Sequence, residues 1–186
     1  MRQPVTPFEV SREVRDALTG SQAAFAWLYR TFAPLVHSIH LGMATHARAD
    51  ELTQDTFAIA FARLPALREA HRFGPWIAAI ARRNFPREPW HEERFADDHD
   101  QASNAAGPDE SADAERVLRS IQALPEAYRD TLMLRLVEGR SGPEIAALTG
   151  LTPQSVRVNL HRGMAKLRLA LGMTPAHEEV PDVPAP

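Results

Sequence analysis

One segment, SGPEIAALTGLTPQSVRVNLHRGMAKLRLAL, constrains the fold of this chain more than any other. Ser141 and Glu144 have the S-x-x-E spacing of a capping box, which predicts the start of a helix. Gly150 permits the left-handed backbone conformation that ends a helix and turns the chain. Thr152 and Pro153 predict a second helix start, because threonine caps helices well and proline suits their first position. The segment is therefore predicted to be a helix-turn-helix.

The second helix of this motif has the composition of a helix that binds nucleic acid. From position 153 to position 171 it carries four basic residues and no acidic one, whereas a solvated helix usually mixes both signs. Its apolar residues recur at helical spacing and predict an inward face, formed by Val156, Leu160, Leu167 and Leu171. The opposite face would present polar and basic side chains to base edges in the major groove. For this segment alone, the alternative is an antiparallel helical hairpin with a basic outer face.

The rest of the chain also has helical periodicity, with no alternation typical of strands. Residues 22–85 and 113–171 place apolar side chains at helical spacing, broken at Pro65, and a third helix is expected to begin near Pro75 and stop at Pro86. We therefore predict an all-α fold of two small helical domains joined by a flexible acidic linker, with the helix-turn-helix in the second domain. The predicted boundaries are an N-terminal extension at 1–21, a first domain at 22–87, the linker at 88–112, the second domain at 113–172 and a disordered tail at 173–186.

The acidic charge of the chain is segregated. Residues 88–116 hold ten acids and two bases, a net charge of −8, and residues 172–186 carry −3, which leaves +8 on the remainder of a chain whose total is −3. Local patches govern association with polyanions more than the total does, so the balance is compatible with DNA binding.

Composition also narrows the class and compartment. The chain has no cysteine, which excludes disulfides and thiolate metal sites. Its first residues lack the apolar core of a signal peptide, and no run approaches the ~18 apolar residues of a membrane span. We expect a soluble, cytoplasmic protein without a membrane segment.

Two ordered groups of motifs are shared with a known family. The first group comprises FAWLY (25–29), DELTQDTF (50–57) and RFGPWIAAIARRN (72–84). The second group comprises ALPEAYRDTLMLRLVEG (123–139), EIAALTGLTPQSV (144–156) and LHRGMAKLR (160–168). With these strings in this order, the chain resembles the sigma factors of bacterial RNA polymerase, specifically the extracytoplasmic-function (ECF) group of the sigma-70 family.

The resemblance implies that the first domain binds the polymerase clamp and the minus-ten promoter element. The implied polymerase-binding residues are Asp50, Glu51, Gln54, Asp55 and Phe57. The implied minus-ten residues are Arg63, Arg68, Arg72, Phe73, Arg82 and Arg83. Their chemistry agrees, because cations bind the backbone of a single strand while aromatic rings or pockets hold unstacked bases. Core packing is the alternative for both Phe73 and Trp76, and for Trp76 it is the favoured interpretation. Pro86 departs from the family pattern, so the usual contacts are not carried over past Arg83.

The resemblance further implies that the second domain reads the minus-thirty-five element. The residues predicted to contact it are Thr152, Gln154, Ser155, Arg157, Asn159, His161, Arg162 and Lys166. Core RNA polymerase and promoter DNA are the implied partners. An anti-sigma factor is a further candidate, since free factors of this group are often held by one. The expected function is promoter recognition and DNA melting in transcription initiation, without catalysis, cofactor or metal.

Two other classes of protein would share part of this sequence pattern. A helix-turn-helix regulator that acts without joining polymerase would share the second domain, but it has no need for the DELTQDTF helix. A helical metalloenzyme is conceivable because His37 and His40 are three residues apart and His46 is near. The chain lacks cysteine and the H-E-x-x-H motif. Histidines scattered over the surface explain its eight histidines better than a metal site does.

Overall fold

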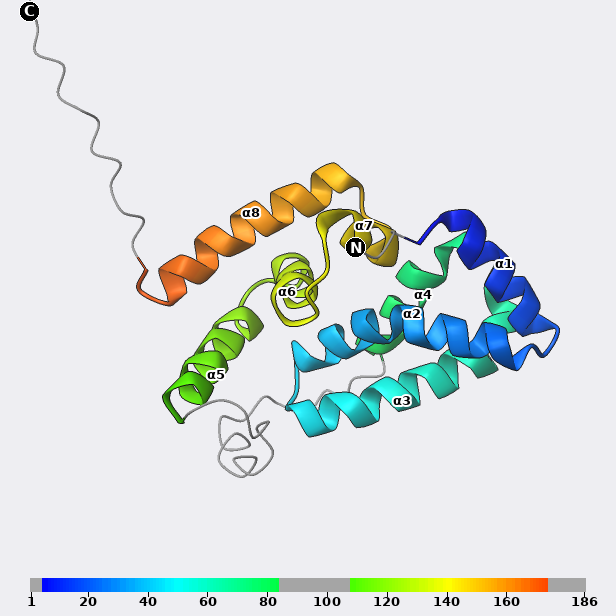
Figure 1. Ribbon diagram of the computed structural model, residues 1–186, viewed down its shortest axis with the longest axis horizontal. Coiled ribbons are helices and arrows are strands. Elements are labelled where there is room, and N and C mark those ends of the chain that lie inside the picture. The colour runs from blue at the N-terminus through cyan, green and yellow to red at the C-terminus, as the bar shows by residue number, and fades with distance from the viewer. Residues whose placement is uncertain (1–4, 84–107, 174–186) are drawn as a thin grey trace, which may run out of the picture.

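The computed structural model describes residues 5–83 and 108–173, and every regular element in these two ranges is helical (Figure 1). The first range forms α1 (Pro7–Leu18), α2 (Gln22–Leu41), α3 (His46–Ala62), the single turns η1 (Leu64–Ala66) and η2 (Ala70–Arg72), and α4 (Phe73–Arg83). The second range forms α5 (Pro108–Gln122), α6 (Glu126–Leu132), the π-helical turn η4 (Met133–Val137), α7 (Gly142–Thr149) and α8 (Pro153–Ala170). The all-α prediction is confirmed. No helix in the described ranges is long and apolar enough to cross a membrane.

The residues predicted as an N-terminal extension include a packed helix. Thr6 and Glu9 form a capping box, in which the Thr6 backbone N–H donates to Glu9 Oε2 at 2.8 Å. Val10, Val14 and Ala17 follow at helical spacing and are buried against the first domain. Helix α1 therefore belongs to that domain, and its beginning was readable from the T-P-x-E pattern at Thr6.

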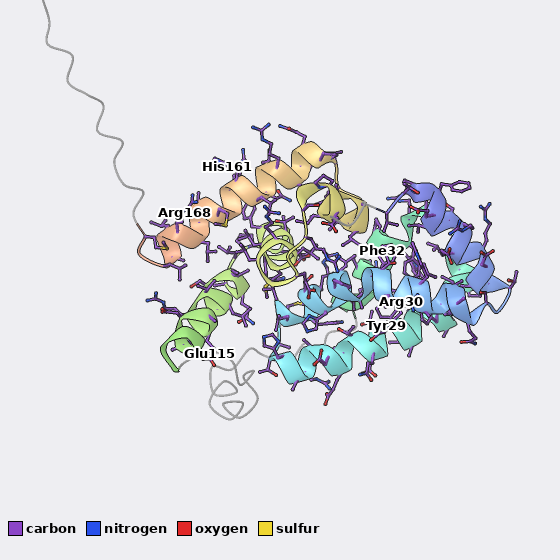
Figure 2. All side chains as sticks on the ribbon, viewed as in Figure 1. Tyr29, Arg30, Phe32, Glu115, His161 and Arg168 are labelled. Atoms are coloured by element: carbon purple, nitrogen blue, oxygen red, sulfur yellow. The ribbon has the colours of Figure 1, made fainter. Side chains whose placement is uncertain are left out.

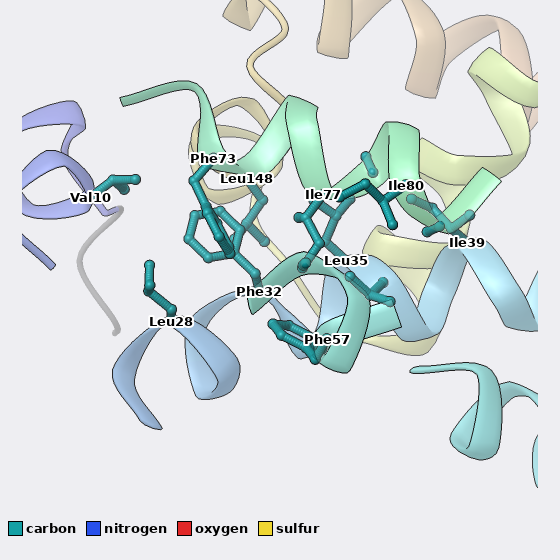
Figure 3. Close-up of a cluster of buried hydrophobic side chains, with 14 of the residues drawn as sticks. Val10, Leu28, Phe32, Leu35, Ile39, Phe57, Phe73, Ile77, Ile80 and Leu148 are labelled. Carbon is teal, nitrogen blue, oxygen red and sulfur yellow. The ribbon is translucent and has the colours of Figure 1, made fainter. Parts of the chain in front are cut away.

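Helix α2 carries the core of the first domain. It packs against α1, α3 and α4, and Ser21 begins it by accepting a hydrogen bond from the Ala24 backbone N–H at 3.3 Å. The rings of Phe32 on α2 and Phe73 on α4 meet edge to face with centroids 5.0 Å apart, and both side chains are fully enclosed (Figure 3). Each such buried side chain stabilises the fold by roughly 1.5–3 kcal/mol relative to an exposed one.

The two domains share this core instead of standing apart. Leu134, Ile145 and Leu148 of the second domain are buried in the same apolar cluster as Phe32 and Phe73. Figure 3 shows Leu148 beside Phe73, and a Cβ on Gly74 of α4 would meet both the Leu148 carbonyl oxygen and the Phe32 ring. A second cluster joins residues of α2 and α3 to the helices of the other domain: Leu41, Ala49, Ile121, Leu132, Met133 and Leu167.

The helix-turn-helix forms as its sequence predicts. Ser141 and Glu144 make the capping box, with the Ser141 backbone N–H donating to Glu144 Oε2 at 2.8 Å. Gly150 ends α7 in the left-handed conformation with φ of 72°, and Thr152 caps α8. Gly163 lies against α6, where a Cβ would stand 3.1 Å from Leu132, so a small residue lets α8 approach closely.

Several boundaries differ from the predicted ones. Helix α4 begins at Phe73, two residues before Pro75, because the single turn η2 leads directly into it. Helix α5 begins at Pro108, within the stretch predicted as linker. The predicted effect of Pro86, most of the acidic linker and the predicted tail from position 174 lie outside the described residues.

Candidate nucleic-acid interface

The outward face of α8 is basic and without acidic partners. Arg157, Arg162, Lys166 and Arg168 are all exposed, and none of them forms an ion pair with another residue of the described ranges. His161 and Arg168 lie on this helix at the rim of the molecule (Figure 2). Helix α8 is anchored from its other side by Val156, Gly163 and Leu167, which are buried. Among the described residues, the helix therefore presents positive charge with which no carboxylate is paired, which suits phosphate binding.

The first turn of α8 is organised by its own side chains. Thr152 Oγ1 accepts a hydrogen bond from the Ser155 backbone N–H at 3.1 Å and shares one with Ser155 Oγ at 2.8 Å. These two residues therefore fix the helix start, while Gln154 and Arg157 are exposed beside them. Asn159 is half-buried. The predicted minus-thirty-five residues thus share one helix, with the most accessible of them on its outer face.

The basic residues predicted to bind the minus-ten strand fall into two groups. Arg63, Arg68 and Arg72 are exposed around the turns η1 and η2, and Arg83 is exposed at the end of α4. Arg82 differs, because its guanidinium pairs with two carboxylates of α6. Its Nε lies 2.7 Å from Glu126 Oε1, and its Nη2 contacts Asp130 Oδ2. In this conformation the Arg82 guanidinium is therefore paired with carboxylates of the protein itself, whereas DNA binding would require it to contact phosphate or bases.

Two aromatic residues with predicted contact roles are buried. Phe73 has no exposed surface in this conformation, which agrees with the alternative of core packing, and the base contact stays a prediction that requires the ring to become accessible. Phe57 is 2% exposed and packs against Tyr29, with ring centroids 4.6 Å apart, so in this conformation it supports α3 from inside and its polymerase contact stays a prediction. Trp76 is half-buried beside Phe73, as a core residue at the domain edge would be.

The polar residues predicted to bind polymerase lie on the outer face of α3. Asp50, Glu51, Gln54 and Asp55 are all exposed. Glu51 Oε2 accepts from Arg48 Nη1 at 2.6 Å, which uses part of its charge within the helix. Buried Thr53 and Phe57 hold the opposite face of α3 in place. The four polar side chains therefore form one accessible acidic strip, here called the α3 strip.

His37 connects this strip to the second domain. Its Nδ1 lies 3.0 Å from Glu138 Oε1 and its Nε2 lies 3.4 Å from Asp50 Oδ1. The hydrogen bond with Glu138 raises the pKa of His37 above its ordinary value, against the opposing effect of burial. No sequence signal links positions 37 and 138, which are separated by 101 residues.

His40, like His37, has a structural partner. His40 is buried, its Nε2 lies 2.9 Å from Thr56 Oγ1, and burial lowers its pKa to about 4. Among the described residues, no group of three or more His, Asp or Glu side chains has an arrangement that could hold a metal ion. The metalloenzyme alternative therefore gains no support from His37, His40 and His46.

The two halves match two family models that define a class of protein. Residues 28–87 match the model described as Sigma-70 region 2, and residues 114–167 match the model described as Sigma-70, region 4. With a helical first domain, a basic helix-turn-helix and both models in this order, the molecule is a sigma-70-type transcription initiation factor.

Similar proteins narrow this class to one group. The RNA polymerase sigma factor CarQ of Myxococcus xanthus is 37% identical over 160 residues, covering 82% of this chain and 92% of CarQ. The ECF RNA polymerase sigma factor SigD of Mycobacterium tuberculosis (strain ATCC 25618 / H37Rv) is 29% identical over 178 residues, covering 83% and 80%. The chain belongs to the ECF group of RNA polymerase sigma factors.

A solved structure has the same fold. CnrH, in complex with the cytosolic domain of CnrY, superposes with a TM-score of 0.58 at 24% identity, covering 88% of this chain and 97% of CnrH. The agreement extends over both domains of this chain.

Proposed function

We propose that this sigma factor joins core RNA polymerase through the α3 strip, reads the minus-thirty-five element with α8, and contacts the minus-ten strand with the arginines of its first domain. One observation carries the proposal: four basic side chains on α8 are exposed, and none is paired with another described residue. Phosphate contacts from such residues supply most of the sequence-independent affinity, while neighbouring polar side chains such as Gln154 read base edges.

The chain acts by binding, without catalysing a reaction, and works in the cytoplasm where polymerase and promoter are found. Energy from captured single-stranded bases would offset part of the cost of opening the duplex. We add α1 to the predicted first domain and the start of α5 to the predicted second domain. The first domain then binds polymerase and the minus-ten strand, and the second binds the minus-thirty-five element.

A separate anti-sigma factor is proposed as a further partner. CnrH is held by the cytosolic domain of a second protein in its solved structure, and this chain shares its fold. Co-purification of the tagged full chain from its own cells would test this partner, and a chain recovered only with polymerase would contradict it.

Run-off transcription with purified core polymerase and a library of upstream sequences tests the function. We expect transcripts that depend on this protein, with aligned promoters sharing two elements. If core polymerase binds the protein but no transcript forms, promoter recognition is the wrong part of the proposal. If core polymerase does not bind, the alternative of a regulator independent of polymerase is favoured.

The α3 strip can be tested separately. Reversing the charge of exposed Asp55 to arginine should weaken binding to core polymerase about tenfold, because a like charge would replace an attractive one at the contact. The matched control is Asp113→Arg on α5, an exposed carboxylate outside the strip. Equal binding by both variants would remove α3 from the polymerase interface.

A further inference from the structure

The contact of Arg82 with α6 joins a proposed DNA-binding residue to the opposite domain. Arg82 lies in the last turn of α4, and both of its carboxylate partners lie on α6. Glu126 is 58% exposed, whereas the Asp130 side chain is only 7% exposed. One guanidinium therefore holds two carboxylates across the domain boundary.

Asp130 has two cationic neighbours: Arg82 across the domain boundary, and Arg129 on its own helix, whose Nε lies 3.8 Å from Asp130 Oδ1. Burial raises the pKa of Asp130, and the charge of Arg82 opposes that rise. A buried carboxylate without a cation is costly, so the second domain is stabilised by keeping Arg82 where it is. A carboxylate pair and a phosphate present the same kind of oxygen acceptors to a guanidinium.

The surrounding interface holds the two DNA-reading elements against each other. The turn of the helix-turn-helix meets the first turn of α4, where a Cβ on Gly150 would stand 2.5 Å from Pro75. Gln122 Nε2 donates to the Leu41 carbonyl oxygen at 2.8 Å, and His37 meets Glu138 at 3.0 Å. The interface between the two domains is therefore closely packed at Gly150 and Pro75, and it also contains polar contacts between side chains and backbone of the two domains.

This arrangement cannot engage both promoter elements at once. Their names place them about 25 base pairs apart, which is roughly 85 Å of duplex at about 3.4 Å per base pair. Pro75 and Gly150 are in contact, and α8, which begins three residues later at Pro153, is 18 residues long. At about 1.5 Å per residue, α8 extends over only about 27 Å. The domains must separate before both elements are bound.

We propose that Asp130 and Glu126 act as an internal substitute for the promoter backbone, holding Arg82 and keeping the free factor closed. The inference rests on the proposed function, which gives Arg82 and α8 their DNA roles. Opening releases Arg82 for nucleic acid and parts the helix-turn-helix from α4. A factor that is mostly closed binds its partners with reduced apparent affinity, in proportion to the open fraction.

Energy transfer between two dyes on the free full-length chain tests the closed state. The chain has no cysteine, so cysteines introduced at exposed Ala66 and Leu151 can be labelled without background. We expect Asp130→Asn with Glu126→Gln to lower the transfer efficiency, since both substitutions keep side-chain size and remove the charges that hold Arg82. The matched control, Asp113→Asn with Glu115→Gln on α5, changes the net charge equally and should leave the efficiency unchanged.

A single variant and a transcription assay test the same lock in two other ways. Glu126→Gln alone changes a largely exposed side chain, so it cannot unfold the domain, and it should open the factor by a smaller amount. In run-off transcription, the double variant should reach half-maximal activity at a factor concentration about threefold to tenfold lower than the unmodified chain.

The outcomes separate this proposal from the proposed function. Unchanged transfer in the Asp130→Asn, Glu126→Gln variant, with normal transcription by the unmodified chain, would overturn the internal lock and leave the sigma role intact. Lower transfer in the variant, with no transcript from either the variant or the unmodified chain, would support the lock as a structural contact and contradict the proposed promoter role of the chain.

Discussion

The backbone of Gly74 on α4 lies directly against the backbone of Leu148 on α7: a Cβ at position 74 would stand 2.2 Å from the Leu148 carbonyl oxygen. Carbonyl oxygens of a packed helix cannot move aside as a side chain can. The two domains therefore approach more closely here than any residue larger than glycine permits.

Gly74→Ala should separate the domains at this point and destabilise the packed chain by about 1–3 kcal/mol, the usual cost of overpacking a core. Urea unfolding monitored by circular dichroism measures the change. Gly142→Ala is the matched control, because nothing lies within 4 Å of the Cβ it would add. If both variants unfold at the same urea concentration, the backbones are not in contact in solution.

Arg157→Ala and Arg162→Ala should each weaken binding to minus-thirty-five duplex DNA. Losing one phosphate contact lowers the slope of log K against log salt by about one, whereas losing a base contact costs about 1–3 kcal/mol and relaxes specificity at one position. Titrations with fluorescent duplex at several salt concentrations distinguish these effects. Arg12→Ala on α1, an exposed arginine paired with Glu13, is the control. Unchanged footprints for both α8 variants would refute the assignment of the recognition helix.

Acidification should strengthen the link between His37 and Glu138. The pKa of His37 is raised in the packed state, so this stabilisation is fully present below the ordinary value of 6.5 and is lost as pH rises through the raised pKa. The free energy of unfolding of the unmodified chain should therefore exceed that of Glu138→Gln by more at pH 5.5 than at pH 8. His40, whose pKa is lowered to about 4, destabilises both proteins alike on acidification. A difference that is constant with pH would exclude the link.

Phe73→Ala should act through stability before it acts through DNA. Removing a fully buried phenylalanine from a core costs about 3–5 kcal/mol. Thermal unfolding of the free protein measures this loss in the absence of nucleic acid. Phe8→Ala on α1 removes the same ring from a side chain that is 69% exposed and should change little. A stable Phe73→Ala protein with weakened binding to single-stranded DNA would support the base-contact role.

Local signals in the sequence predicted local structure well. The caps at Ser141 and Thr152 and the turn at Gly150 involve groups a few residues apart, so their spacing carries the geometry. Thr6 and Glu9 have the same spacing and cap α1, although this stretch was predicted as an extension.

Long-range structure was not predictable in this way. Arg82 and Asp130 are 48 residues apart, and no pattern in either helix specifies the other as its partner. The burial of Phe57 and Phe73 could not be decided from the sequence for a related reason: an aromatic residue among charged neighbours suits both a contact site and a core, and only the packing of α2 against α3 and α4 shows these two rings enclosed. The α8 and α3 assignments stay predictions, supported by exposure.

Leu134, Ile145 and Leu148 are buried in one apolar cluster to which both domains contribute. Separation would bring these side chains into water at the moment when the DNA-reading surfaces become free. Exposed apolar patches promote aggregation. The opened factor should therefore be the aggregation-prone form of this protein, and its lifetime in the cell should depend on how quickly another macromolecule covers the uncovered leucines.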